Sequence, residues 1–346
     1  MDWMTAGGLI AERAPIPDML VTAGMRRVIG ERQRELGAAN PNSSAVFAQC
    51  MDEHPIAEHA DAANEQHYEL PPEFFALILG PRRKYSSCLY MPGTRTLAQA
   101  EDAALAQTVA HAGLEDGQTV LELGCGWGSL SLYMSERFPN SSIVCVSNSA
   151  PQRRHIELQT RMRNLTNLKI ITADMNDFSI DKRFDRVVSV EMFEHMANWR
   201  GLLARVRGWL KPDGKLFIHI FSHASAPYRF DHKDQNDWIG QHFFTGGIMP
   251  SHDLIQHFSD LFAVEQEWRW NGLHYKRTAM DWLANYDANA RPIGKILRDV
   301  YGKDAALWRR RWRMFFLATA ELFGYANGEA WGVSHYLLKP NASPSP

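Results

Sequence analysis

The sequence predicts an α/β fold in which helices cover both faces of a seven-stranded, mostly parallel sheet. Two observations lead to this fold class. From residue 96 onward, helical and strand patterns alternate, as they do in parallel sheets. The first strand also runs directly into a glycine turn and a helix, which is a common start of such sheets. With 346 residues and 45% hydrophobic content, the chain can build one large domain or two modest ones.

The first 80 residues have a different pattern and are predicted to be a separate helical segment. Helices are expected at 18–36, weakly at 47–66, and at 73–79, with a loop at 37–44. Gly80-Pro81 then breaks the chain. We expect residues 1–80 to form a helical lid or extension, with a homodimer contact as the alternative role, and residues 81–346 to form the main domain.

The main domain is expected to begin with the alternating elements. Their predicted order is helix 97–112, strand 119–123, helix 129–137, strand 142–146, helix 152–162, strand 168–172, strand 184–190, helix 194–210, turn 211–214 and strand 215–221. An insertion at about 223–262, rich in aromatics and glycine, is expected to cover the substrate. The closing elements are strand 263–270, helices near 277–300 and 304–323, and strand 331–338, with the last two strands antiparallel at one edge.

The most informative segment is 120–129, VLELGCGWGS, in which an apolar strand ends in three alternating glycines. Glycine permits a positive φ and close approach of a ligand to the backbone. The free amides at the start of the next helix attract electron-rich groups. Strand, turn, helix and the acidic Glu122 together predict a nucleotide-like cofactor at Gly124, Gly126 and Gly128.

The acidic residue favours S-adenosylmethionine (SAM) over NAD as that cofactor. The spacing is G-x-G-x-G rather than G-x-G-x-x-G, and a carboxylate at Glu122 suits an ammonium and a sulfonium better than a pyrophosphate. The second strand ends in Ser147 without an acidic residue, so Asn148 or Gln152 is the candidate for the ribose. Asp174 is placed to accept from the adenine amino group, or else to cap a helix.

Composition excludes several other classes of function. The net charge of −2 provides no field for nucleic acid or anionic membrane. The four widely spaced cysteines form no metal-ligand pattern, so no metal is expected, and reduced thiols indicate a cytoplasmic protein. No apolar run approaches the roughly 20 residues of a spanning helix. The basic segment 308–313, WRRRWR, is interpreted as a solvated helix face, with weak peripheral lipid contact as the alternative.

From about residue 85 the chain resembles the cyclopropane-fatty-acid-synthase-like SAM methyltransferases, especially the coclaurine-type N-methyltransferases that act on tetrahydroisoquinoline amines. The segments that carry this resemblance are YSSC at 85–88, VLELGCGWGS at 120–129, EMFEH at 191–195, HIFSH at 219–223, FFTGGIMPS at 243–251, NGLHY at 271–275 and AELFGY at 320–325. The resemblance implies a Rossmann-like class I methyltransferase fold. It also implies that SAM is surrounded by Tyr85, Ser86, Gly124, Gly126, Ser147, Asn148, Gln152, Asp174, Met175 and Val190.

The segment EMFEH directly follows the fourth strand, so it lies beside the glycine turn. Glu194 and His195 come three and four residues after Glu191, and on a helix all three would share a face. The attacking amine must be neutral, whereas a free alkylamine has a pKa of about 10, so a base is needed. Glu194 and His195 are the base candidates and Glu191 is the orienting partner. The alternative is an acidic first helical turn.

Two histidines, His219 and His223, end the fifth strand and are expected on the cofactor side, with His219 as a catalytic candidate and a buried core role as the alternative. The resemblance implies that cyclopropane synthases hold a bicarbonate with residues that match Glu194 and His219, together with a tyrosine. That tyrosine position falls on Phe315. The missing phenol favours plain methylation over ring closure.

An aromatic substrate pocket is also expected. Its candidates are Trp238, Phe243, Phe244, Phe315 and Trp331. Aromatic faces stabilise cations by about 0.5–2 kcal/mol each, although core packing is the alternative for each residue. The predicted function is SAM-dependent N-methylation of a small amine with aromatic or hydrophobic bulk, yielding S-adenosylhomocysteine (SAH). The alternatives are methylation or cyclopropanation of an unsaturated acyl lipid, and a non-catalytic SAM-binding module.

Overall fold

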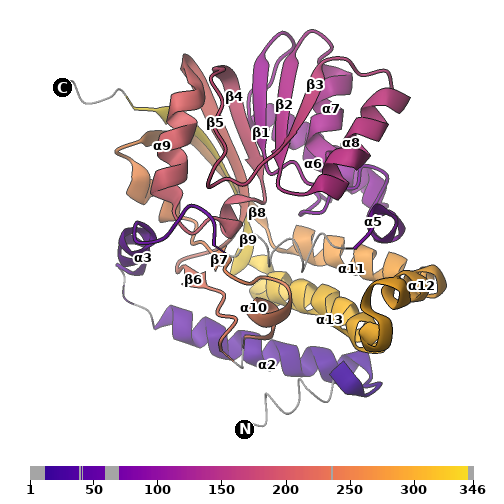
Figure 1. The fold of residues 1–346 in the computed structure, drawn as a ribbon. Helices are drawn as coiled ribbons and strands as arrows, with labels where there is room; N and C mark the ends of the chain where they lie inside the picture. Colours follow the sequence, from indigo (N-terminus) through magenta and orange to yellow (C-terminus); the bar gives the residue numbers. More distant parts are fainter. Residues whose placement is uncertain (1–11, 39, 41, 59–69, 235–236, 342–346) are drawn as a thin grey trace.

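The computed structural model describes residues 12–38, 40, 42–58, 70–234 and 237–341. Seven strands form one sheet in the order β3-β2-β1-β4-β5-β9-β8 (Figure 1). Their bounds are β1 Thr119–Leu123, β2 Ser142–Ser147, β3 Leu168–Thr172, β4 Phe184–Val190, β5 Leu210–His223, β8 Phe262–Asn271 and β9 Trp331–Pro340. The five strands from β3 to β5 run parallel. The mostly parallel sheet predicted from the sequence is confirmed.

Alternate residues of the central strands bury opposite faces of this sheet. Val120 and Val188 pack against α6 (Leu97–His111) and α7 (Ser129–Arg137). Leu121 and Val187 point the other way and pack against α9 (Trp199–Trp209). The helix α8 (Ala150–Met162) covers β2 and β3 beside α7. Both faces are therefore buried, and the carboxyl ends of β1, β2 and β4 are left open for a site.

The last strand in sequence does not lie at the edge of the sheet. β9 pairs antiparallel with β5 on one side and with β8 on the other. The predicted antiparallel pairing of the two closing strands is confirmed, and β9 is the inner member of that pair.

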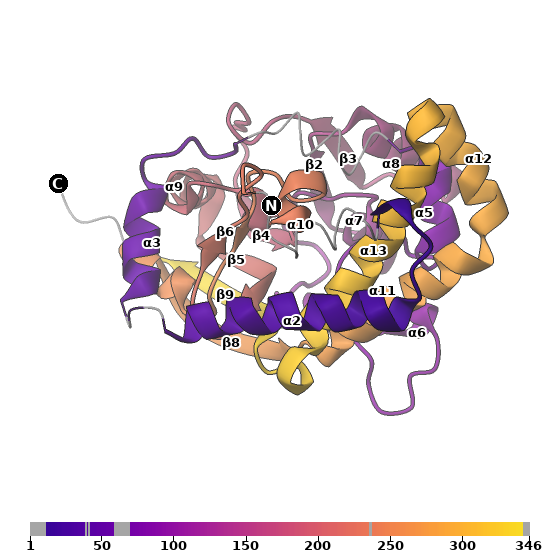
Figure 2. The same ribbon diagram turned by 90° about the horizontal axis from the view of Figure 1, so that it is seen from below.

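A second layer lies below the carboxyl ends of the strands (Figures 1 and 2). It contains α11 (Leu273–Ala288), α12 (Ala290–Tyr301) and α13 (Ala305–Gly324), and the insertion contributes β6 (Tyr228–Arg229), α10 (Trp238–His242), β7 (Ile248–Met249) and the 3₁₀ turn η2 (Leu254–Phe258). The N-terminal helices are α2 (Asp18–Gly37), α3 (Ser43–Met51) and α5 (Pro72–Ile78). Figure 2 shows α2 crossing this layer from below.

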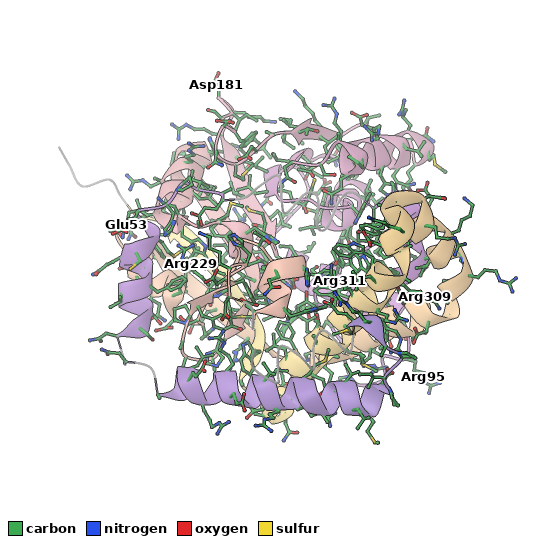
Figure 3. The ribbon with its side chains drawn as sticks, turned by 60° about the horizontal axis from the view of Figure 1, so that its bottom comes forward. Glu53, Arg95, Asp181, Arg229, Arg309 and Arg311 are labelled. Atoms are coloured by element: carbon green, nitrogen blue, oxygen red, sulfur yellow. The ribbon has the colours of Figure 1, made fainter. Side chains whose placement is uncertain are left out.

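Ion pairs join the N-terminal segment to α13. Arg26 Nη2 donates to Glu321 Oε1 at 2.9 Å, and Arg313 pairs with Asp18. Burial opposes ionisation of Glu12, but hydrogen bonds from His242, Arg311 and Trp238 lower its pKa to about 2. Glu12 therefore joins Arg311 of α13, labelled in Figure 3, to His242 of α10. The expected solvated face at 308–313 is wrong in part, because Arg311 and Arg313 bind acids of the N-terminal segment.

Four predicted boundaries differ from the structure. The helix expected at 47–66 begins earlier, at Ser43, and ends at Met51; residues 59–66 lie outside the described residues. The helix expected at 194–210 is a 3₁₀ turn, η1 (Phe193–His195), followed by α9, because the side chain of Asn198 accepts from the amide of Gly201 at 2.7 Å and starts a new helix. The turn at 211–214 lies inside β5, and the helical region near 277–300 is divided at Asn289.

No helix among the described residues is both long enough and apolar enough to span a bilayer.

The glycine at the start of α7 is required by the approach of α8. Gly128 has φ +80°, and a Cβ there would lie 2.7 Å from Cγ1 of Ile156. We expect Gly128→Ala to lower the free energy of unfolding by about 1–3 kcal/mol, because it adds a strained φ and a clash. Urea denaturation measures this loss. Gly126→Ala is the matched control: its φ is +52° but its Cβ would meet no atom within 4 Å, so its loss should be smaller.

Candidate active site

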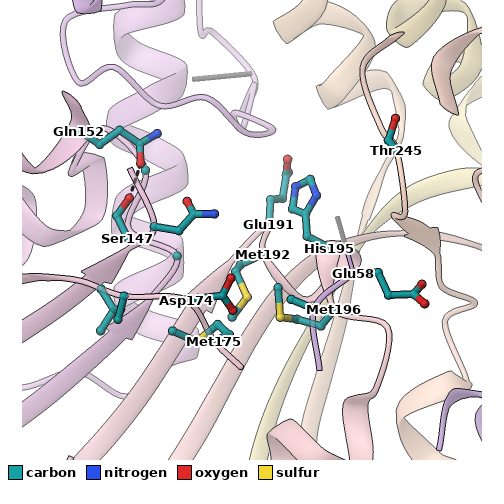
Figure 4. A pocket seen from close by; sticks show the side chains of 16 residues that line it. Glu58, Ser147, Gln152, Asp174, Met175, Glu191, Met192, His195, Met196 and Thr245 are labelled. Atoms are coloured by element: carbon teal, nitrogen blue, oxygen red, sulfur yellow. Dashed lines mark hydrogen bonds between the residues drawn. The ribbon is translucent and has the colours of Figure 1, made fainter. Parts of the chain in front are cut away.

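Two adjoining cavities open at the carboxyl ends of β1, β2 and β4. The outer cavity, drawn in Figure 4, has about 760 Å³ of space including the part open to solvent, and the inner one has about 560 Å³ by the same measure. They share Gly124, Gly126, Gln152 and Glu191, so they are two parts of one site. This is the edge where ligands bind in doubly wound sheets.

Eleven of the twelve residues predicted to bind the cofactor line these cavities. Ser147, Asn148, Asp174 and Met175 line the outer cavity; Tyr85, Ser86, Glu122 and Val190 line the inner one; Gly124, Gly126 and Gln152 line both. Gly128 lines neither cavity and lies at the contact between α7 and α8, so its role in binding stays a prediction. Asp174 accepts from the amide of Asn176 at 2.7 Å, which forms a turn after β3 rather than a helix cap.

The polar atoms of the inner cavity fit a ligand such as SAM. Gln152 Nε2, Ser129 Oγ and Thr108 Oγ1 are buried and have no hydrogen-bond partner among the described residues. Ser147 Oγ donates to Gln152 Oε1 at 2.5 Å, which fixes this amide and leaves its NH₂ group for a ligand. Burial raises the pKa of Glu122 to about 7 against the donation from Ser131. An incoming cation would favour the ionised carboxylate.

Glu191 is the most constrained residue of the site. Its backbone has φ +46°, in the left-handed region that a side chain rarely adopts. Its Oε1 accepts from the amide of Ser87 at 2.9 Å and lies 3.3 Å from His219 Nε2, and its Oε2 accepts from Tyr275 Oη at 2.7 Å. Burial raises the pKa of Glu191, and the charge of Lys84 acts against this rise. The carboxylate is thus held at the junction of the two cavities.

The expected shared face of the EMFEH segment is wrong. Glu191 precedes the 3₁₀ turn, and both Glu191 and His195 line the outer cavity (Figure 4). The ring of His195 stacks on Phe244 with centroids 4.6 Å apart. Glu194 is buried, lines neither cavity, and has no partner for Oε2 among the described residues. Burial and the charge of Glu191 raise the pKa of Glu194 well above its usual value.

Neither of the two strand histidines, His219 and His223, lines the two cavities. His219 is fully buried beneath Glu191, and burial lowers its pKa well below its usual value. Its ring lies 4.5 Å from that of His335, its register partner on β9. His223 Nε2 lies 3.0 Å from Gln33 Oε1 of α2. His223 ends β5 at the carboxyl edge of the sheet, as expected, but it lines neither of these cavities and joins β5 to the N-terminal helix α2.

The five aromatic residues predicted for the substrate pocket belong to a packed cluster instead. None of Trp238, Phe243, Phe244, Phe315 and Trp331 lines either cavity. Phe243 and Phe315 stack with centroids 4.5 Å apart, and Trp238 donates to Glu12. Phe244 stacks on His195, which lines the outer cavity, and also contacts Phe221 and Phe230. Trp331 packs on His223 and Tyr325, whereas Trp238, Phe243 and Phe315 pack between α10 and α13.

Sequence reasoning missed many residues of the site, of which Tyr275 is the clearest case. Tyr275 lay in the segment NGLHY, yet its role was not inferred, and its phenol donates to Glu191. The inference from Phe315 against ring closure concerns the surroundings of Glu194 and His219 and stays a prediction. Ala57, Glu58, Met196 and Thr245 line the outer cavity, and no pattern in the sequence identified them. Among the described residues, no group of three or more His, Cys, Asp or Glu is placed to hold a metal ion.

Comparisons with known proteins match this chain to methyltransferases and cyclopropane synthases. A family model of mycolic acid cyclopropane synthetase matches residues 57–329. The chain is 36% identical over 289 residues to (S)-coclaurine N-methyltransferase of Thalictrum flavum subsp. glaucum, covering 82% of this chain and 80% of the relative. It is 32% identical over 224 residues to cyclopropane-fatty-acyl-phospholipid synthase of Escherichia coli (strain K12), covering 64% and 56%. The crystal structure of coclaurine N-methyltransferase bound to N-methylheliamine and SAH matches with a TM-score of 0.91 at 31% identity, covering 95% and 97%.

Proposed function

The chain belongs to the mycolic acid cyclopropane synthetase family, and on this premise we propose that it methylates the nitrogen of a small tetrahydroisoquinoline-like amine. It has the class I methyltransferase fold and is a SAM-dependent methyltransferase. The observation that carries the choice of amine is the match of nearly the whole fold to an enzyme solved with an N-methylated amine and SAH.

The eleven cavity-lining residues named above would hold SAM, which supplies an electrophilic methyl group on a sulfonium. Glu191 lies where the two cavities meet, so its carboxylate would attract the ammonium form of the acceptor and stabilise the positive charge that develops on nitrogen. His195, on the acceptor side, would take the proton that the amine must lose before attack. The neutral nitrogen would receive the methyl group that SAM supplies, with SAH as the product.

The outer cavity offers a surface for an apolar ring system. Met192 and Met196 line it beside His195 (Figure 4). Methionine side chains adapt to irregular apolar shapes. Glu58 and Thr245 add polar groups on the same side. This combination supports an acceptor with a hydrophobic body and one basic nitrogen. The homodimer, the weak lipid contact and the cytoplasmic location stay predictions.

An assay with purified protein and methyl-labelled SAM tests the proposal. We expect transfer of the label to heliamine and coclaurine, with the methylated amine identified by mass spectrometry. An arylalkyl amine without the fused ring should react more slowly, because it fills less of the outer cavity. A parallel reaction contains vesicles of unsaturated phospholipid. Label in acyl chains with none in any amine would overturn the proposal and favour the lipid reaction.

A further inference from the structure

We propose that Lys84 is a positioning residue that turns the hydroxyl of Ser86 toward the carboxylate of the cofactor and keeps Glu191 ionised. The proposal rests on the proposed use of SAM. It concerns one buried ammonium at the wall of the inner cavity, in the loop between α5 and α6.

The geometry at Ser86 fixes the direction of its hydroxyl hydrogen. Lys84 Nζ lies 2.5 Å from Ser86 Oγ and 2.6 Å from the carbonyl oxygen of Ser87. An ammonium can only donate, so Ser86 Oγ must accept from Lys84. The hydrogen of the Ser86 hydroxyl therefore points elsewhere. Because Ser86 also lines the inner cavity, that hydrogen is available to an anionic oxygen there, and the carboxylate of SAM provides one.

The same lysine is joined to Glu191 through one residue. Lys84 holds the carbonyl oxygen of Ser87, while the amide of Ser87 donates to Glu191 Oε1 at 2.9 Å. The other titratable groups that face Glu191 are His219 from β5, Tyr275 from α11 and Glu194 from η1. His219 is neutral and Tyr275 donates a neutral hydroxyl, whereas Glu194 adds negative charge when ionised. Lys84 provides the positive charge that acts against the rise in the pKa of Glu191.

The cost of the buried charge supports a role beyond packing. Lys84 is only 2% exposed, and burial lowers its pKa. An apolar side chain of similar length would fill this space without that desolvation cost. Glu101, buried on α6, accepts from the amides of Arg82 at 2.9 Å and Lys84 at 3.1 Å and so shapes the loop without the Lys84 side chain. A purely structural role for the ammonium would predict a loss of stability and nothing more.

Calorimetric titration with SAH and SAM tests the proposal without an acceptor. We expect Lys84→Met to weaken SAH binding by at least about tenfold, the value of one hydrogen bond to a charged group. Ser86→Ala should cost a similar factor alone and little more in the Lys84→Met background. Lys182→Met is the matched control, because Lys182 Nζ donates to the hydroxyl of Ser142 at 2.9 Å on the exposed surface. It should bind as the parent does.

The pH dependence of SAM binding tests the charge. Loss of Lys84 removes an opposite charge, so the pKa of Glu191 should rise. The pH below which SAM affinity falls, the acid limb of the binding profile, should therefore move up by about 1 pH unit. Lys84→Arg keeps the charge but not the position of Nζ, so it should weaken SAH binding without moving this limb. Unchanged SAH affinity in a folded Lys84→Met protein would overturn the proposal. If Lys84→Met does not fold, unchanged affinity or a moved limb in Lys84→Arg overturns it. Normal SAH binding with no amine turnover would reject the proposed function instead.

Discussion

Glu191→Gln should lower kcat/KM for the amine by about 10²–10⁴-fold. The substitution keeps the shape of the side chain and its acceptor oxygen but removes the charge that draws the ammonium and stabilises the methylated nitrogen. The amide oxygen can still accept from the Ser87 amide, and Tyr275 Oη can accept from the amide NH₂ group, so the variant removes the charge and can keep both hydrogen bonds. Steady-state kinetics at saturating SAM measures the loss.

The control for this variant is Glu53→Gln on the surface, which should retain parental kinetics. SAH affinity of Glu191→Gln should stay within about threefold, because SAH carries no sulfonium charge for the carboxylate to meet. A loss of SAH binding as large as the loss of turnover would show that Glu191 shapes the cofactor site rather than the transfer step.

His195→Ala should lower kcat by about 10²–10⁴-fold, the usual contribution of a positioned general base. The ring lines the outer cavity and Phe244 fixes its plane by stacking. The loss should shrink as the pH approaches the pKa of the amine, since more of the acceptor then arrives without its proton. A pH profile of kcat from 7 to 10 for the parent and the variant measures this convergence.

Phe244→Leu tests whether the His195 imidazole acts by its position or by its ability to take a proton. It removes the stacking contact but leaves the imidazole, so we expect a smaller loss with the pH profile of the parent. His257→Ala, outside both cavities, should have no effect. If His195→Ala loses the same factor at pH 7 and pH 10, His195 places the acceptor and another group takes its proton.

The cofactor side was predictable because its signals are local. A strand that ends in alternating glycines specifies a turn within ten residues, and the cavity residues after β2 and β3 follow directly from the strand ends. At Gly128 the same signal, a glycine with positive φ, also serves the close packing of two helices, and the sequence alone does not separate the two uses.

The acceptor side was not predictable because distant segments build it. Tyr275 reaches Glu191 across 84 residues of sequence, and Ala57 and Glu58 come from the N-terminal segment. The aromatic candidates have the residue types of a cation-binding pocket, but packing within one buried aromatic cluster uses their rings. Amino-acid type alone does not separate these two uses, since both bury an aromatic face.

The interior position of β9 has a consequence for synthesis. During translation, β5 and β8 leave the ribosome well before residues 331–340, and until then each keeps a row of unpaired backbone groups facing the vacant place. The nascent protein should therefore remain dependent on chaperones until residues 331–340 emerge. A premature stop near residue 325 should yield an insoluble product, although every residue that lines the two cavities would already be present.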